Sequence, residues 1–103
     1  MNRDFKLPSG KELVVLELLV AKHEMYGLEM VNASPKLGRG TVYVLLNRME
    51  DKGYIRSRHE KEDGASGLPK RVYSITGLGQ RAYYAWQQAQ TSFWMSPALE
   101  SGK

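Results

Sequence analysis

Hydrophobic residues recur along the chain at two spacings, and the spacing separates the expected helices from the expected strands. In the middle of the chain, the i, i+3, i+4, i+7 pattern of one helix face is filled by Val42, Leu45, Leu46 and Met49. Gly53 stands just after the last of these positions, where a helix commonly ends in a left-handed residue. The stretch therefore predicts an amphipathic helix with its stop signal attached.

An earlier helix is predicted to begin at Ser9, because Ser9 and Glu12 match the S-x-x-E capping box. From Leu13 to Ala21 the residues are apolar nearly all the way round, and only Glu17 interrupts them. A helix of this kind lies centrally in a fold or is covered by a second subunit. Both interpretations stay open at this point.

A short second helix is predicted over residues 26–31, and a turn over residues 32–38 separates it from the central helix. Pro35 cannot easily continue a helix, and it also restricts the residue before it, so the chain must change direction here. A connection of only a few residues between two helices is typical of a helix-turn-helix.

Two strands are predicted after the central helix. Alternation over residues 55–60 places Arg56 and Arg58 on one face, away from Ile55. A polar, glycine-containing tip leads to a return strand at residues 71–75. The order of elements predicts a mainly α fold with a two-stranded hairpin, the winged helix-turn-helix.

The last helix is predicted from about residue 78 to residue 95, with Thr76 as its N-cap. Five of the chain's ten aromatic residues lie between residues 83 and 94, and an apolar patch too large for one small domain to cover usually marks an interface. We expect the chain to form a homodimer through Leu78, Ala82, Tyr83, Ala85, Trp86, Ala89, Phe93 and Trp94. A pocket between subunits that stacks planar ligands, and a surface for a partner protein, stay open as alternatives.

The 103 residues are expected to form one domain with short extensions. We assign residues 1–8 to an N-terminal arm, 9–76 to the winged helix-turn-helix, 77–96 to a C-terminal dimerisation helix, and 97–103 to a disordered tail. Cysteine is absent and no apolar run approaches the roughly 20 residues of a membrane span, so we expect a cytoplasmic protein without membrane contact. The net charge of +4 is compatible with an anionic partner.

The face of the central helix opposite its apolar stripe is slim and carries hydrogen-bonding groups, as a helix that enters a major groove requires. Arg39 and Arg48 are candidates for contacts to phosphate or guanine, and Asn47 for reading adenine. Thr41 and Tyr43 can donate to phosphate oxygens, which sets register without reading bases. The candidate DNA-binding residues are Lys36, Arg39, Gly40, Thr41, Tyr43, Val44, Asn47, Arg48, Arg56, Arg58, Lys70 and Arg71. In the alternative interpretation, Asn47 and Arg48 are solvated residues of a surface helix.

Nothing in the pattern indicates an enzyme. His23 and His59 each stand beside a glutamate, but neither has a second ligand at the spacing of a metal site. We therefore expect no catalytic residues, no metal and no cofactor.

Three motifs in the chain are similar to one known family. They are Tyr26-Gly27 followed by Glu29, then Gly40-Thr41-Val42-Tyr43-x-x-Leu46-x-x-Met49-Glu50-x-x-Gly53-x-Ile55, then Arg71-x-Tyr73-x-Ile75-Thr76-x-x-Gly79. From about residue 13 to residue 80 the chain resembles the PadR family of bacterial transcriptional regulators, in its short type with one helix after the wing. The resemblance implies a winged helix-turn-helix that dimerises through its C-terminal helix and binds a pseudo-palindromic operator in double-stranded DNA, usually as a repressor. It also implies that a small aromatic effector can release the DNA.

A function of another class stays open beside this one. A winged helix can also serve as a protein-protein interaction module, such as an adaptor or an anti-repressor, whose central helix never meets DNA. Titration with DNA at several salt concentrations distinguishes the two, because DNA binding weakens as salt rises.

Overall fold

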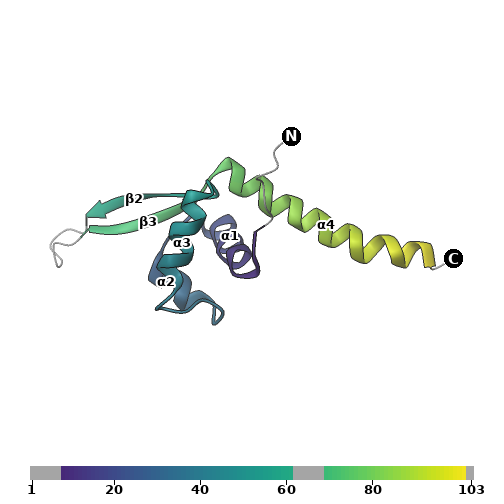
Figure 1. Ribbon diagram of the computed structural model, residues 1–103, viewed down its shortest axis with the longest axis horizontal. Coiled ribbons are helices and arrows are strands. Elements are labelled where there is room, and N and C mark those ends of the chain that lie inside the picture. Colours follow the sequence, from purple (N-terminus) through teal and green to yellow (C-terminus); the bar gives the residue numbers. More distant parts are fainter. Residues whose placement is uncertain (1–7, 62–68, 102–103) are drawn as a thin grey trace.

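The computed structural model describes residues 8–61 and 69–101, with side chains described for residues 8–60 and 70–91. The elements in chain order are α1 (Gly10–Lys22), β1 (Glu24–Tyr26), α2 (Gly27–Ala33), α3 (Val42–Asp51), β2 (Ile55–Lys61), β3 (Pro69–Ile75) and α4 (Gly77–Ser101). The β2–β3 hairpin extends from one side of the helical body and α4 from the other, so the molecule is elongated, at 65 × 32 × 22 Å (Figure 1).

Helix α1 begins as predicted, with Ser9 as its N-cap. The Ser9 hydroxyl accepts a hydrogen bond from the backbone N–H of Glu12 (3.3 Å), and Glu12 Oε1 accepts one from the backbone N–H of Ser9 (2.9 Å). Along the helix, Val15, Leu16 and Leu19 are fully buried. Because α3 and α4 both pack against α1, this helix forms the centre of the core, as the first of the two interpretations required.

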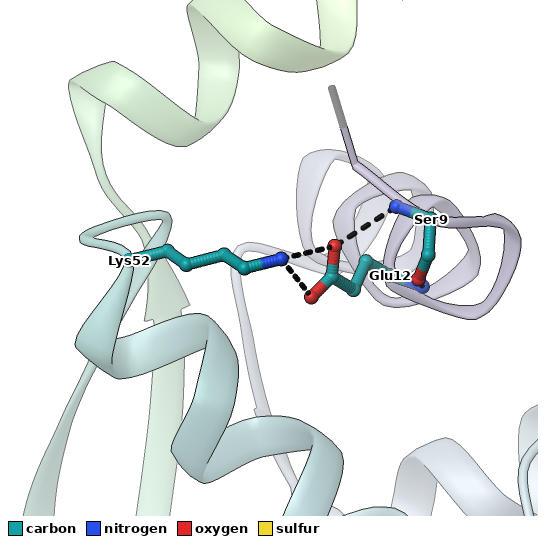
Figure 2. Close-up of polar contacts among 3 residues, drawn as sticks. All are labelled: Ser9, Glu12 and Lys52. Atoms are coloured by element: carbon teal, nitrogen blue, oxygen red, sulfur yellow. Dashed lines mark hydrogen bonds and ion pairs between the residues drawn. The ribbon is translucent and has the colours of Figure 1, made fainter. Parts of the chain in front are cut away.

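An ion pair with a buried carboxylate ties the start of α1 to the end of α3. The Glu12 side chain is only 1% exposed, and Lys52 donates to both of its carboxylate oxygens at 2.9 and 3.1 Å. Figure 2 shows the carboxylate held between Lys52 on one side and the Ser9 N–H on the other. The same residue therefore caps one helix and fixes the position of another.

Helix α3 ends at the predicted glycine. Gly53 has φ +84°, and its N–H bonds to the carbonyl of Glu50, while the N–H of Tyr54 bonds to the carbonyl of Met49. These two bonds form a Schellman motif, which needs a left-handed residue at this position. The chain thereby turns directly from α3 into β2.

The sheet has three antiparallel strands in the order β1-β3-β2, so the predicted two-stranded hairpin is present with one strand added. The additional strand, β1, was not predicted from the sequence. Met25 pairs with Tyr73, on the side of β3 opposite to β2. Three residues are too few for a periodic signal, and their strand conformation depends on pairing with a segment far along the chain.

Thr76 caps the start of α4, as predicted. The Thr76 hydroxyl accepts from the N–H of Gly79 (3.0 Å) and also donates toward the carbonyls of Gly53 and Tyr54. The helix therefore starts against the turn that follows α3. Close packing here depends on Gly79, because a Cβ at that position would lie 2.1 Å from the Tyr54 carbonyl oxygen.

The helix continues to Ser101, past residue 95, where it was predicted to end. A proline removes one backbone hydrogen bond and strains the preceding turn, but Ala98, Leu99 and Glu100 all favour helix and the chain resumes it. Of the N-terminal arm predicted at residues 1–8, only Pro8 is among the described residues, and it is buried. Most of the hairpin tip also lies outside them.

No helix in the described part of the chain is both long and apolar enough to cross a membrane.

Candidate nucleic-acid interface

Helix α3 has the two contrasting faces that the sequence predicted. Its four apolar residues at helical spacing are all buried in the core. On the other face Tyr43 is 44% exposed and Val44 is 59% exposed, and Asn47 and Arg48 are exposed beside them. A helix with this arrangement is anchored along one side and presents mixed polar and apolar groups to a partner along the other.

The turn before α3 places further candidates at the same end of this face. Lys36, Arg39, Gly40 and Thr41 are all exposed, whereas Leu37 is buried and anchors the turn. The N–H groups of Thr41 and Val42 bond to the Gly38 carbonyl at 3.2 and 2.9 Å. Thr41 is the N-cap, but its side chain makes no capping bond, so its hydroxyl stays on the exposed surface.

Tyr43 rests against the first turn of α2. A Cβ at Gly27 would lie only 2.6 Å from Cε1 of the Tyr43 ring and 2.9 Å from its hydroxyl oxygen. The ring is therefore supported from behind by glycine backbone while almost half of the residue faces solvent. Gly27 therefore makes room for the Tyr43 ring against α2.

A groove of about 430 Å³ runs between α2, α3 and β3. It is lined by Tyr26, Gly27, Leu28, Glu29, Asn32, Tyr43, Lys70 and Arg71. The Lys70 ammonium lies 5.1 Å from the centre of the Tyr26 ring, within the range of a cation–π contact. The groove thus brings Lys70 and Arg71 of β3 beside Tyr43 of α3, and all three were predicted to bind DNA.

Arg71 is held in this groove by side chains of β2. Its guanidinium lies 3.0 Å from the Ser57 hydroxyl oxygen and 3.2 Å from His59 Nε2. Ser57 in turn donates to Glu50 of α3 at 2.6 Å. A chain of polar contacts therefore connects the wing to the central helix.

Arg56 and Arg58 lie on the opposite face of the sheet. The register pairs Ile55 with Ile75 on one face and Arg56 with Ser74 on the other, as the alternation predicted. Arg58 donates to both carboxylate oxygens of Glu24, at 2.7 and 3.3 Å, and lies 3.6 Å from Glu60. The hydrogen bond from Arg58 lowers the pKa of the Glu24 carboxyl, and the same bond raises the pKa of Arg58.

Sequence reasoning missed several residues at this surface. Ser57 and His59 were not proposed as site residues, although strand alternation places them on the face of Ile55, toward α3. Tyr26 and Asn32 also line the groove without having been predicted to do so. Among the described residues, no three His, Cys, Asp or Glu side chains gather closely enough to hold a metal ion.

The predicted dimer-interface residues fall into three groups. Ala82 (1% exposed) and Tyr83 (6%) are buried in the protomer's own core, with Leu78 and Trp86 half-buried against it. Ala85 and Ala89 are exposed, as is Tyr84, which makes an edge-to-face contact with Tyr83 at 5.6 Å between ring centres. The side chains of Phe93 and Trp94 lie outside the described residues.

The model of the transcriptional regulator PadR-like family matches residues 15–85, and the comparison with curated proteins gave no match. A PadR family transcription regulator from Clostridium difficile R20291 is 24% identical (TM-score 0.66; 88% of this chain and 96% of that one are covered). TA0346 from Thermoplasma acidophilum is 28% identical (TM-score 0.65; 86% and 88%). Bacillus subtilis PadR, solved in complex with operator DNA, is 17% identical (TM-score 0.64; 87% and 60%).

These solved structures share the winged-helix fold described above, and the family match covers the helix-turn-helix, the wing and the start of α4. It also overlaps the stretch from about residue 13 to residue 80, which carries the resemblance seen in the sequence. The chain therefore belongs to the PadR-like family of transcriptional regulators, whose members control transcription and are not enzymes.

Proposed function

We propose that this protein is a dimeric DNA-binding regulator that represses transcription from a pseudo-palindromic operator in the cytoplasm. The observation that carries the proposal is the exposed face of α3, which is anchored by four buried residues and flanked by cations from the turn and the wing. Bacillus subtilis PadR, which shares the fold, was solved with operator DNA. A helix of this shape fits a major groove.

The contacts divide by position. Arg39, Asn47 and Arg48 are proposed to reach base edges, where arginine suits guanine and asparagine suits adenine. Thr41 and Tyr43 donate to phosphate oxygens at the groove wall. Lys36, Arg56, Lys70 and Arg71 supply the remaining positive charge. Arg58 is the weakest member of the predicted set, since its guanidinium is already paired with Glu24 and Glu60.

Dimerisation is proposed to use the part of α4 that extends beyond the body. The stripe that packs on the protomer's own core at Leu78 and Ala82 continues along the helix as Ala85 and Ala89, which are exposed. Pairing with a second copy would cover them, together with apolar residues of α1 such as Leu18 that are only partly buried. Two α3 helices could then bind half-sites about 34 Å apart.

Relief of repression by a small aromatic ligand is the third part of the proposal. Trp86 stacks on Tyr83 with 6.3 Å between ring centres and is half-buried, so a planar compound could extend this stack at the proposed dimer contact. Such a ligand should quench tryptophan fluorescence. If a panel of planar aromatic compounds leaves the fluorescence unchanged, this part of the proposal is wrong and the regulation has another basis.

Titration with duplex DNA at several salt concentrations tests DNA binding itself. We expect the binding constant to fall on a log–log plot with a slope of about −0.9 per neutralised phosphate. Arg48→Ala should cost roughly 1–3 kcal/mol for specific DNA if Arg48 reads a base, or flatten the slope by about one unit if it contacts phosphate. Arg81→Ala is the matched control, because it removes the same charge from an exposed position on α4.

The operator is best found by selecting duplexes from a random pool with the purified protein. If no duplex is retained even at low salt, the interaction-module alternative replaces this proposal. If Arg48→Ala and Arg81→Ala behave alike, the assignment of Arg48 to the interface is wrong.

A further inference from the structure

The guanidinium of Arg71 has a defined set of partners, which is unusual for an exposed cation. One terminal nitrogen donates to the Ser57 hydroxyl oxygen at 3.0 Å, and the other lies 3.2 Å from His59 Nε2. Arginine can only donate, so His59 Nε2 must be the acceptor. This hydrogen bond therefore requires the tautomer of His59 that carries its proton on Nδ1.

Ser57 connects Arg71 to α3 through a second hydrogen bond. Its hydroxyl hydrogen is used in the 2.6 Å bond to Glu50 Oε2, which leaves the oxygen lone pairs to accept from Arg71. The bonds thus run in one direction, from β3 through β2 to α3. Because a serine hydroxyl has a single hydrogen, Glu50 determines that Ser57 faces Arg71 as an acceptor.

The charged groups Arg71 and Glu50 both influence the hydroxyl of Tyr73, which pairs with Ser57 across the sheet. Burial raises the pKa of the Tyr73 hydroxyl; the positive charge of Arg71 opposes this, whereas Glu50 and Tyr43 raise the pKa further. Arg71, Glu50 and Tyr43 therefore all lie near one buried hydroxyl group. This point is where the wing joins the exposed face of α3.

Arg71 also lines the groove between α2, α3 and β3, beside Tyr43 and Lys70. The one carboxylate in the lining, Glu29, accepts a hydrogen bond from the backbone N–H of Tyr26 at 2.7 Å. Cations therefore outnumber acids in the groove. When α3 occupies the major groove of DNA and the wing lies beside it, the DNA strand that borders the major groove passes between α3 and the wing.

We infer that Ser57 and His59 are positioning residues that hold Arg71 in the groove between α2, α3 and β3. There Arg71 contacts a backbone phosphate of the DNA strand that borders the major groove. The inference rests on the proposed DNA-binding function and deepens it. It assigns the wing's grip on DNA to one prearranged arginine rather than to the general charge of the hairpin. It also gives a role to two residues that touch no DNA themselves.

A double-mutant cycle tests this assignment. Arg71→Ala should weaken duplex binding and flatten the salt slope by about one unit. Ser57→Ala should weaken binding severalfold in the wild-type background and have no further effect in the Arg71→Ala background, because Ser57 acts only through Arg71. Ser57→Thr keeps an acceptor oxygen for Arg71, and His59→Gln supplies one in place of the ring nitrogen, so both variants should bind close to the unaltered protein.

The cycle separates positioning from a loss of wing stability. If Ser57→Ala weakens binding equally in both backgrounds, or not at all, the inference is overturned. Thermal unfolding of each variant shows whether the hairpin itself has been damaged, and Ser57→Thr supplies a folded control with the hydroxyl retained.

The histidine tautomer provides a test that needs no DNA. Long-range ¹⁵N–¹H correlation spectra of the full chain should show His59 protonated on Nδ1, and Arg71→Ala should abolish that preference. A His59 that carries its proton on Nε2 in the unaltered protein overturns the inference and leaves the proposed function standing. Failure of the unaltered protein to bind any duplex, with His59 protonated on Nδ1, instead removes the proposed function and the phosphate contact that depends on it.

Discussion

Gly79 allows α4 to pack closely against the carbonyl of Tyr54, just before β2, and substituting it should disrupt that contact. A Cβ there would lie 2.1 Å from the Tyr54 carbonyl oxygen and 2.8 Å from an Ile75 side-chain atom. The backbone has to move, so we expect Gly79→Ala to lower the free energy of unfolding by about 1–3 kcal/mol or more. Gly77→Ala is the control, because its Cβ would meet nothing nearer than 3.6 Å.

Urea unfolding of the two variants measures the difference. Alanine favours helix over glycine by up to about 1 kcal/mol, so Gly77→Ala should be neutral or slightly stabilising. Equal stability of the two variants would show that the approach of α4 to Tyr54 is looser than the structure has it.

The ion pair between Glu12 and Lys52 should respond unequally to loss of its two partners. Lys52→Met leaves a carboxylate that is 1% exposed without its cation, whereas Glu12→Gln frees a lysine that is one-third exposed and can turn to water. We expect Lys52→Met to cost about 1–3 kcal/mol, below the range for fully buried pairs because Lys52 is partly solvated. Glu12→Gln should cost less, since the amide oxygen can still accept from Ser9. Chemical denaturation measures both values, and the reverse order would contradict this account.

At the scale of elements, local signals in the sequence predicted most of the fold. The capping box of Ser9 and Glu12 marks the start of α1, and Gly53 marks the end of α3, because each signal depends on neighbouring residues alone. Strand β1 and the end of α4 were not predicted. A strand of three residues is defined by its distant partner β3, and Pro97 is a strong stop signal that this helix overrides.

The candidate DNA-binding surface was also predicted in part from the sequence. Helical periodicity is sufficient to identify which residues of α3, such as Asn47 and Arg48, face outward. It cannot show that Arg71 lies on the α3 side of the wing while Arg58 is paired with Glu24 on the other side. That distinction depends on the register of β2 with β3 and on the unpredicted β1, which supplies Glu24.

The contact between α2 and α3 yields a prediction that separates binding from stability. In Gly27→Ala the new methyl group would meet the far end of the Tyr43 ring at 2.6 Å. An exposed ring can swing aside, so we expect the free energy of unfolding to change by less than about 1 kcal/mol while duplex affinity falls as much as in Tyr43→Phe or further. Tyr43→Phe keeps the ring seated and removes only the hydroxyl. If Gly27→Ala binds DNA like the unaltered protein, the seat of Tyr43 does not matter for binding.

For the molecule as a whole, the hairpin and α4 extend from the body in different directions, which suggests that DNA binding and dimerisation use separate parts of the chain (Figure 1). The hairpin extends on the side of α2 and α3, and α4 extends away from them for about 37 Å in total, at 1.5 Å per residue. A dimer contact along the far part of α4 would leave the exposed face of α3 uncovered in each protomer. Dimerisation and DNA binding can therefore be disturbed separately.

Ala89→Glu and Thr91→Glu test this separation with the same added charge. Both residues are exposed in the protomer, but two positions along a helix differ by about 200° in direction, so only Ala89 lies on the apolar stripe. We expect Ala89→Glu to convert the dimer to monomers in sedimentation experiments at micromolar concentration, because it would bury an unpaired carboxylate at the interface. Thr91→Glu should stay dimeric. The monomeric variant should keep its helical content and still bind a single half-site weakly, since α3 and the wing are unchanged. An unaltered protein that sediments as a monomer, or an Ala89→Glu variant that remains dimeric, would place the interface elsewhere.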